Sequence, residues 1–172
     1  QSRGLNHLGV SRMIWRHSED VNLWLAASNV VRSFDLGASA PGLQRVFSNR
    51  GLAGIDGTIS SALGIAADTG RPERAVMGDL SFVYDLPALA ARPGGDPDIQ
   101  ILVFDDGGGT IFHSLEHGNV ADQETYRKYF GIRQEIDIVG VASACGWDAR
   151  SATTIEELRD IVLAPVRGRS LI

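Results

Sequence analysis

Two aspartates, Asp79 and Asp106, each stand just behind a short apolar segment, at 75–77 and 99–104. Such segments are typical of buried strands. If the two strands are parallel neighbours, both carboxylates reach the same edge of the sheet. Two carboxylates about 4 Å apart repel by on the order of 4 kcal/mol at an effective dielectric near 20. A divalent cation removes that cost, and an all-oxygen set of ligands without His or Cys favours magnesium or calcium over zinc.

Three glycines, 107–109, follow Asp106 directly. Glycine lets the backbone come close to a ligand, so this turn can offer carbonyl oxygens to a metal or amides to phosphates. A helix that begins at Asp79 directs further amides to the same edge. Because neighbouring side chains of a strand point to opposite faces, only one of Asp105 and Asp106 is expected to face the ligand. These features together predict a diphosphate held through a cation.

The elements that position these residues follow from apolar periodicity. Apolar residues at helical spacing predict a helix over 79–91, and strand, helix and strand in this order form a parallel βαβ unit. Elsewhere the pattern predicts strands at 22–27 and 44–47, a short strand from Trp147, and helices at 59–70, 122–130, 138–145 and 154–162. Strands that alternate with helices predict an α/β fold, a mainly parallel sheet with helices on both faces.

The composition bounds the class of protein. With 172 residues, 44% hydrophobic and 22% charged, the chain suits one globular domain, and its net charge of −5 argues against a nucleic-acid partner. No apolar run approaches the roughly 18 to 20 residues of a membrane span. The start has no signal-peptide pattern and Cys145 is the only cysteine, so a cytoplasmic protein is expected. The segment 1–21 is interpreted as the tail of a preceding linker or domain, and the end as truncated within a strand.

Two readings from the residues alone remain open beside the cation site. The aspartates and glycines can be helix caps and turns. Alternatively, the segment 103–110 resembles the phosphate loop of the actin-like ATPases, in which the glycines turn a tight β-hairpin. The following residues, 111–119, lack the alternation that the second strand of such a hairpin requires.

A more specific resemblance rests on several motifs at compatible spacing. Gly78-Asp79, followed by Asp106, resembles the thiamine diphosphate motif, in which a Gly-Asp pair and a later Asn-rich turn hold magnesium and diphosphate. With the segments 28–32, 48–57 and 107–112, the chain resembles the C-terminal cofactor domain of 2-succinyl-5-enolpyruvyl-6-hydroxy-3-cyclohexene-1-carboxylate synthase, the MenD family of menaquinone biosynthesis. The resemblance covers residues 22–172, which would be the thiamine diphosphate- and magnesium-binding domain.

The resemblance implies roles for the residues of the cofactor site. Asp79, Asp106 and the carbonyl of Gly108 would bind Mg²⁺ or Mn²⁺. Ile55 would be the bulky residue that bends thiamine diphosphate into the conformation in which it reacts. The remaining cofactor contacts would come from Gly54, Gly78 and the amides of Leu80 and Ser81.

The resemblance also implies two substrates, 2-oxoglutarate and isochorismate, which carry several carboxylates. Arg32 and Arg50 would bind them, since arginine is the natural planar partner of a carboxylate. Ser28, Ile111 and Phe112 would line the same pocket. Structural roles stand against these: a solvated helix residue for Arg32, a core residue for Ile55 and simple packing for Phe112.

The chain departs from this family in one turn. Asp105-Asp106-Gly107 stands where the family has an Asn-rich sequence, which leaves an oxygen donor but removes an amide. The family's activating glutamate lies in an N-terminal domain, usually of a partner subunit. The chain alone is therefore expected to be inactive, and the whole enzyme to be a homodimer or homotetramer. Another thiamine diphosphate lyase or decarboxylase, or a non-catalytic remnant domain, remains an alternative.

Overall fold

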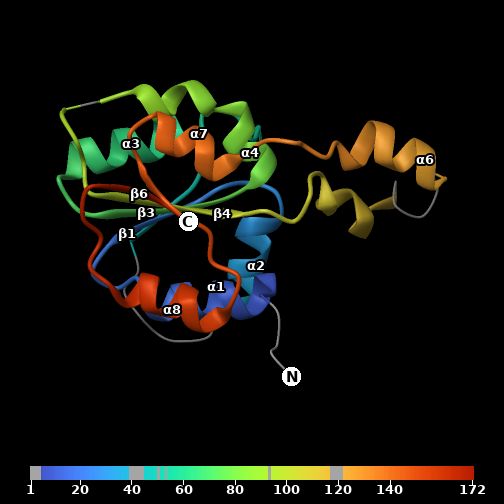
Figure 1. The fold of residues 1–172 in the computed structure, drawn as a ribbon. Coiled ribbons are helices and arrows are strands. Elements are labelled where there is room, and N and C mark those ends of the chain that lie inside the picture. The colour runs from blue at the N-terminus through green and yellow to red at the C-terminus, as the bar shows by residue number, and fades with distance from the viewer. Residues whose placement is uncertain (1–4, 39–44, 50, 53, 93, 117–121) are drawn as a thin grey trace.

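Six parallel strands form one sheet in this computed structural model, which describes residues 5–38, 45–49, 51–52, 54–92, 94–116 and 122–172. The strand order is β2-β1-β3-β4-β6-β5 (Figure 1). The strands are β1 Asn22–Leu25, β2 Arg45–Phe47, β3 Glu73–Gly78, β4 Ile99–Phe104, β5 Asp148–Ala149 and β6 Arg169–Leu171. The chain leaves β1 first toward β2 and then returns to β3 on the other side. This reversal beside β1 is the point at which ligands bind in open α/β sheets.

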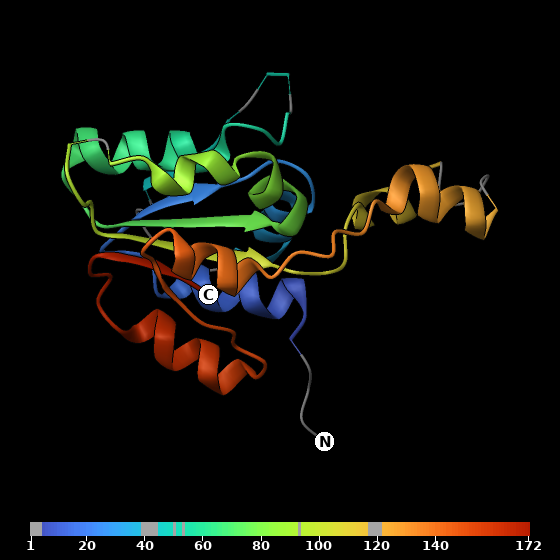
Figure 2. The same cartoon turned by 45° about the horizontal axis from the view of Figure 1, so that its top comes forward.

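Helices cover both faces of the sheet (Figures 1 and 2). One face carries α1 His7–Arg16, α2 Asn29–Gly37 and α8 Ile155–Leu163, and the other carries α3 Thr58–Thr69, α4 Asp79–Tyr84 and α7 Ile138–Ala144. The predicted α/β fold with helices on both faces is confirmed. Helix α1, in the segment 1–21, packs Val10 and Ile14 into the core against α2 and α8.

Side chains of the central strands alternate between two apolar cores. On β3, Ala75 and Met77 join the core under α3, α4 and α7, while Val76 joins the core under α1, α2 and α8. On β4, Ile101 and Leu102 divide in the same way. A strand buried on both faces is apolar throughout, which explains why these segments are continuous hydrophobic runs.

The helix predicted over 79–91 is wrong in its second half. Helix α4 ends at Tyr84, and the chain continues as a 3₁₀ turn, η1 Leu86–Ala90. Pro87 explains the break, because proline has no amide hydrogen and disfavours helical geometry in the residue before it. The Asp85 carboxylate instead accepts hydrogen bonds from the Ser60 amide at 2.7 Å and the Ser60 hydroxyl at 3.2 Å, near the start of α3.

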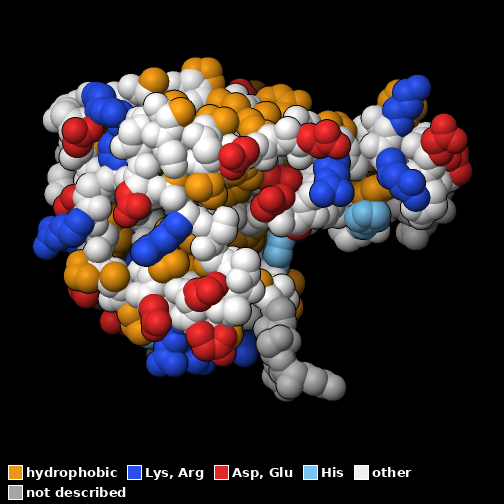
Figure 3. Space-filling view, viewed as in Figure 1, with side chains coloured by type: hydrophobic (Ala, Val, Ile, Leu, Met, Phe, Trp, Pro, Cys, Tyr) orange, Lys and Arg blue, Asp and Glu red, His pale blue; other side chains and the backbone are white. Residues whose placement is uncertain are grey.

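An arm made of residues 110–116 and 122–131 stands out from the body beyond the carboxyl end of β4 (Figure 1). It includes η2 Thr110–Ser114, α6 Gln123–Tyr126 and the π-helical turn η3 Arg127–Gly131. Because α6 runs directly into η3, the helix predicted over 122–130 is confirmed, with π geometry in its second half. Aromatic contacts hold the arm together. The His113 ring stacks on the Tyr126 ring with 4.2 Å between ring centroids, and the Phe112 and Phe130 centroids are 5.6 Å apart. Figure 3 shows that the surface is hollowed beneath the arm.

At the amino end of β3, the fully buried Arg74 joins two helices of one face, α1 and α8, to the sheet. Its guanidinium donates to the Gln100 side chain at 2.8 Å, to Ser18 Oγ at 2.9 Å, and to the carbonyls of His17 at 2.8 Å and Val162 at 2.9 Å. Burial lowers the pKa of Arg74 to about 10, so the side chain stays charged at neutral pH. Every one of these bonds is charge-assisted.

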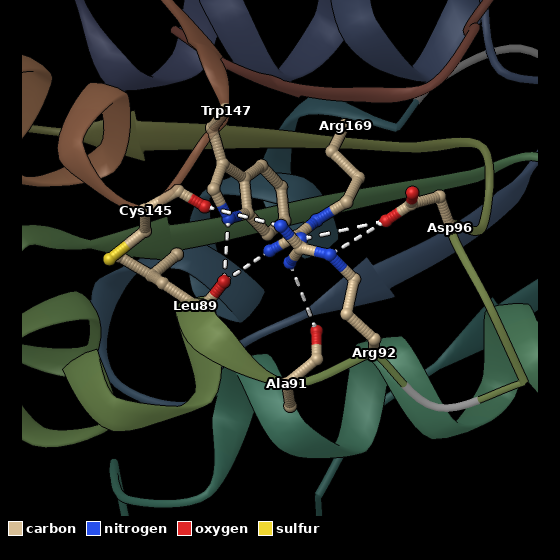
Figure 4. Close-up of polar contacts among 7 residues, drawn as sticks. All are labelled: Leu89, Ala91, Arg92, Asp96, Cys145, Trp147 and Arg169. Carbon is tan, nitrogen blue, oxygen red and sulfur yellow. Dashed lines mark hydrogen bonds and ion pairs between the residues drawn. The ribbon is translucent and has the colours of Figure 1, made fainter.

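A second buried arginine, Arg169, begins β6 and lies over the Trp147 ring, 4.3 Å from its centroid (Figure 4). Its guanidinium and the Trp147 indole both donate to the carbonyl of Leu89. Asp96 Oδ1 lies 3.7 Å from Arg169 Nη1 and 2.8 Å from Arg92 Nε. The cluster fastens η1, the end of α7 and the start of β6 together at the amino ends of the strands.

Candidate cofactor-binding site

A cleft of about 260 Å³ opens at the carboxyl ends of β1, β3 and β4. It brings together residues from four loops that are far apart in the sequence. Of the predicted site residues, those that line it are Ser28, Arg32, Ile55, Gly78, Asp79, Leu80, Ser81, Asp106, Gly108, Ile111 and Phe112. Gly54 is adjacent to Ile55 but does not line the cleft, and Arg50 lies outside the described residues.

Asp79 is the most buried acid of the cleft, with 4% of its surface exposed. Burial raises the pKa of this carboxyl group, and the negative charges of Asp106 and Asp105 raise it further. Hydrogen bonds from the amides of Leu80, at 2.8 Å, and Gly108 oppose the rise in pKa. The site therefore holds mutually repelling carboxylates, which is the electrostatic condition that a cation relieves.

The glycine turn after β4 brings its backbone to the same place. Gly107 and Gly108 have φ angles of 88° and 115°, which strongly favour glycine. A Cβ on Gly108 would lie 2.1 Å from the carbonyl oxygen of Gly131, so the turn packs directly on the arm. The Gly108 carbonyl accepts a hydrogen bond from the Thr110 amide at 2.8 Å and retains a second lone pair for a cation.

The residues after this turn decide against the ATPase-type loop. That alternative requires a β-hairpin, whereas the chain forms the 3₁₀ helix η2 directly at Thr110. Of the two acids before the turn, Asp106 lines the cleft, and Asp105 lines a neighbouring cavity of about 500 Å³ without lining the cleft. Asp106 lies on the wall between the two cavities, because it lines both.

Ser28 and Arg32 form the wall that comes from the start of α2. Ser28 has a φ of 72° and a ψ of −138°, an unusual conformation for a residue with a side chain. Arg32 Nη1 donates to the Ser28 carbonyl at 2.6 Å and so holds this conformation. Backbone strain of this kind, about 1 to 3 kcal/mol, often occurs at ligand sites.

Ile55, Ile111 and Phe112 form the apolar part of the lining. Ile55 is half-buried in the loop before α3, and its carbonyl accepts a hydrogen bond from Thr58 Oγ1 at 3.1 Å. Ile111 and Phe112 belong to η2 at the base of the arm. The lining of the cleft thus combines acids and glycines with apolar side chains.

Sequence reasoning did not assign seven residues that line the cleft: His7, Ala27, Asn29, Val30, Gly109, Thr110 and Leu115. His7 Nε2 lies 3.3 Å from Asp106 Oδ2 and comes from the start of α1, where a lone histidine carries no signal of its own. Asn29 and Thr110 directly adjoin residues that had been singled out. Their polar side chains next to a predicted ligand loop were the signal that could have identified them.

The donors suit magnesium better than a metal that needs a closed set of side chains. Among the described residues, no three His, Cys, Asp or Glu side chains form a metal site. Two carboxylates and a carbonyl nevertheless fit magnesium, which is commonly bound through one or two carboxylates together with phosphate oxygens of a ligand. The residues present therefore fit a cation that is completed by a diphosphate.

Residues 34–169 match the family model described as thiamine pyrophosphate enzyme, C-terminal TPP binding domain. The chain belongs to this family. The part of the chain that matches this thiamine pyrophosphate (TPP)-binding domain includes both acids of the cleft and the glycine turn.

Among curated relatives of this TPP-binding domain, 2-succinyl-5-enolpyruvyl-6-hydroxy-3-cyclohexene-1-carboxylate synthase of Renibacterium salmoninarum is 42% identical, over 98% of this chain and 31% of that protein. The enzyme of the same name from Arthrobacter sp. is 39% identical over 95% of this chain and 28% of that protein. The chain spans about a third of the length of the relatives that it matches.

Two solved structures share the fold of the TPP-binding domain. Benzoylformate decarboxylase from Polynucleobacter necessarius superposes with a TM-score of 0.76 at 20% identity, over 98% of this chain and 32% of that one. A thiamine diphosphate-dependent 4-hydroxybenzoylformate decarboxylase from Rhodococcus jostii gives a TM-score of 0.79 at 17% identity, over 100% and 32%. No helix among the described residues is long and apolar enough to cross a membrane.

Proposed function

We propose that this chain is the TPP-binding domain of a 2-succinyl-5-enolpyruvyl-6-hydroxy-3-cyclohexene-1-carboxylate synthase. The whole enzyme would decarboxylate 2-oxoglutarate and add the remaining four-carbon unit to isochorismate, in menaquinone biosynthesis. One observation carries the proposal: Asp79, which is buried, lines a single cleft together with Asp106 and Gly108, within a domain of the TPP-binding family. Identity of about two fifths to synthases of that name supports this choice of reaction.

In this proposal, Asp79, Asp106 and the Gly108 carbonyl hold Mg²⁺ or Mn²⁺. The cation would offset the burial and the neighbouring negative charges that raise the pKa of Asp79. Thiamine diphosphate, when bound, supplies the electron sink for decarboxylation. The protein's task is to hold the cofactor's charged end, to shape its conformation and to exclude water.

The amides at the start of α4 have different availability for the diphosphate. The Leu80 amide donates to Asp79 Oδ1, so a phosphate oxygen would have to share or replace that hydrogen bond. Ser81 lines the cleft and, with 3% of its surface exposed, is held firmly against the domain. Gly78 lines the cleft beside it, and a side chain there would narrow the approach to these amides.

Ile55 is proposed as the residue that sets the cofactor's bent conformation, with Gly54 beside it in the same loop. A rigid branched side chain in the cleft wall suits this role, because it resists displacement by the cofactor rings. Ile111 and Phe112 would exclude water from the same space.

Arg32 would bind a substrate carboxylate, and the proposal assigns Arg50 the same role. One Arg32 nitrogen already donates to Ser28, which fixes the direction of the guanidinium while its other N–H groups stay available for a second acceptor. Ser28 would contribute to the same pocket. The full enzyme would be cytoplasmic and a homodimer or homotetramer, with an activating glutamate supplied from outside this chain.

Calorimetry on the full-length protein tests the cofactor assignment. Thiamine diphosphate with Mg²⁺ should bind tightly, and Asp79→Ala should weaken binding about a hundredfold or more, because a buried charged ligand is lost. Asp68→Asn, which removes an exposed acid on α3, should bind as the wild type does. Tight binding of magnesium-ATP without binding of thiamine diphosphate would overturn the assignment.

A second assay tests the reaction. Carbon dioxide released from 2-oxoglutarate should be accompanied by a product that incorporates isochorismate. If the protein binds the cofactor but acts only on other 2-oxo acids, such as benzoylformate, it is a different thiamine diphosphate decarboxylase. If it binds the cofactor and turns over none of them, the remnant-domain alternative is favoured.

A further inference from the structure

We infer that Thr110 and Asn29 form a hydrogen-bond relay that orients the Asp106 carboxylate for its cation. This inference rests on the proposed function, because it concerns the cation that Asp106 would hold. It assigns positioning roles to two residues that are not themselves ligands.

The polarity of the relay follows from the chemistry of its groups. Asn29 Nδ2 lies 3.0 Å from Thr110 Oγ1, and Thr110 Oγ1 lies 2.6 Å from Asp106 Oδ2. An amide nitrogen only donates, so the threonine hydroxyl accepts from Asn29. Its single proton is therefore committed to Asp106. A hydroxyl that donates to a carboxylate at this distance makes a charge-assisted hydrogen bond, which is stronger than a neutral one.

The relay also selects one oxygen of Asp106. Both contacts that this carboxylate makes with described side chains fall on Oδ2: the Thr110 hydroxyl, and His7 Nε2 at 3.3 Å. Oδ1 accepts no hydrogen bond from the part of the chain that the structure describes. A carboxylate held through one oxygen presents the other as a single, directed ligand, which suits the strict octahedral geometry of magnesium.

The local backbone explains why such a device is useful here. Gly107, Gly108 and Gly109 separate Asp106 from Thr110, and none of them has a side chain that could restrain the turn. The Thr110 hydroxyl reaches back across this triplet, and Asn29 ties it to the start of α2, 81 positions earlier in the chain. The relay thus fixes the loop after β4 to the loop after β1, across β3, the strand that ends directly before Asp79.

The backbone next to Asn29 is itself restrained. Arg32 Nη1 holds the carbonyl of Ser28, which immediately precedes Asn29. His7 contributes less to the orientation, because its contact with Asp106 is longer and a third of its side chain is exposed. Thr110 is therefore the centre of the relay and Asn29 its anchor.

Manganese binding to the full-length protein tests the relay. Mn²⁺ is titrated in the presence of thiamine diphosphate, and free Mn²⁺ is followed by electron paramagnetic resonance. Thr110→Val keeps the shape of the side chain but removes the hydroxyl, and it should weaken Mn²⁺ binding about tenfold or more. Thr110→Ser restores the hydroxyl and should bind within about threefold of the wild type. Asn29→Leu should lie between the two, since Thr110 then loses its fixed direction.

The arm offers a matched control. Thr125 Oγ1 donates to Asp122 Oδ2 at 2.8 Å, the same kind of pair away from the cleft, so Thr125→Val should leave Mn²⁺ binding unchanged. Circular dichroism checks that each variant is folded. If Thr110→Val does not fold, Mn²⁺ binding by Asn29→Leu tests the relay instead. Wild-type affinity for Mn²⁺ in folded Thr110→Val or Asn29→Leu would overturn the relay. Equal weakening by Thr110→Ser and Thr110→Val would also overturn it. Failure of the wild type to bind Mn²⁺ and cofactor would instead overturn the proposed function.

Discussion

At the amino ends of the strands, the buried Arg74 guanidinium donates to four acceptors, whereas at the carboxyl ends the buried Asp79 carboxylate faces two further acids. Both groups carry charge inside the same domain, where an unpaired charge is costly. The first has its partners within the chain. The second accepts two amide hydrogen bonds and still lacks a counter-charge among the described residues.

This difference separates fold from function. A buried charge whose hydrogen-bond partners all lie within the chain, as at Arg74, locks helices onto the sheet. A buried carboxylate whose neighbours are also negative is retained at a cost in stability, and a ligand has to relieve it. Substitutions at the two ends should therefore affect different measurements: the free energy of unfolding at one end and ligand affinity at the other.

The largest effect on stability is expected at Arg74. Arg74→Ala leaves a cavity and several buried acceptors without a donor, so the free energy of unfolding should fall by about 3 to 5 kcal/mol. Urea denaturation followed by tryptophan fluorescence measures it. Arg12→Ala on the exposed side of α1 is the control and should change stability by less than about 0.5 kcal/mol. A loss below about 1 kcal/mol at Arg74 would contradict the structural role.

Glu73, beside Arg74, should make stability depend on pH. It is fully buried, and burial raises the pKa of its carboxyl group from 4.5 to about 8, an effect that the neighbouring Asn22 side chain partly offsets. Neither carboxyl oxygen has a hydrogen-bond partner of ordinary geometry among the described residues. The folded protein thus binds this proton more tightly than the unfolded chain does, so its contribution is complete below pH 4.5 and is lost as pH rises through about 8.

Glu73→Gln, which has no proton to lose, should flatten that dependence. Denaturation between pH 5 and 9 checks this, and the difference from the wild type should reach a few kcal/mol at the alkaline end. Glu156→Gln, an exposed acid of α8, serves as the control and should leave the pH profile unchanged. Identical profiles for Glu73→Gln and the wild type would show that Glu73 is already ionised at neutral pH.

Gly108→Ala tests the carboxyl end. The new Cβ would approach the Gly131 carbonyl at a backbone φ of 115°, so the turn has to move. A loss of about 2 kcal/mol in stability is expected, with weaker cation binding because the Gly108 carbonyl is displaced. Gly64→Ala is the matched control: it lies inside α3 with open space around it, and should raise stability by about 0.5 to 1 kcal/mol. Equal effects of the two substitutions would contradict the close packing of the turn.

The smallest effect is expected at Ser28. Ser28→Gly relieves the unusual backbone conformation and should raise the thermal midpoint, by an amount equivalent to about 1 kcal/mol. Ser33→Gly, inside α2, should lower it by a similar amount because glycine weakens a helix interior. A fall in the midpoint with Ser28→Gly would show that the serine side chain stabilises this loop more than its conformation costs.

Much of the fold is encoded in local pattern. The apolar runs of β1, β3 and β4 and the stripes of α3, α7 and α8 predicted the element types, because each element must bury one face. The apolar pattern predicted an element wrongly, or its geometry incompletely, where a particular residue or packing contact changes the local backbone. The stripe over 79–91 suggested a single helix, yet Pro87 divides it into α4 and η1. Over 122–130 the predicted helix forms, but its second half takes π geometry, with Tyr126 and Phe130 stacked within the arm.

The residues of the candidate site likewise fall into those that the sequence predicts and those that only the tertiary structure places. Asp79, Asp106 and the glycine triplet could be found from the sequence, since an acid or a glycine at the end of a strand is a local feature. Their meeting in one cleft required only that β3 and β4 be parallel neighbours. Asn29 and Thr110 adjoin predicted residues, but their contact with each other, like that of His7 with Asp106, depends on how separate loops pack and could not be predicted.

The sequence by itself determined the element types, the parallel sheet and the acids and glycines at its carboxyl edge, because these follow from periodicity and backbone chemistry along the chain. The tertiary structure decided which carboxylate oxygen is restrained, which arginine is buried and which amides are already occupied. Those outcomes depend on distances between residues up to 88 positions apart, as between Arg74 and Val162, and no local pattern encodes them.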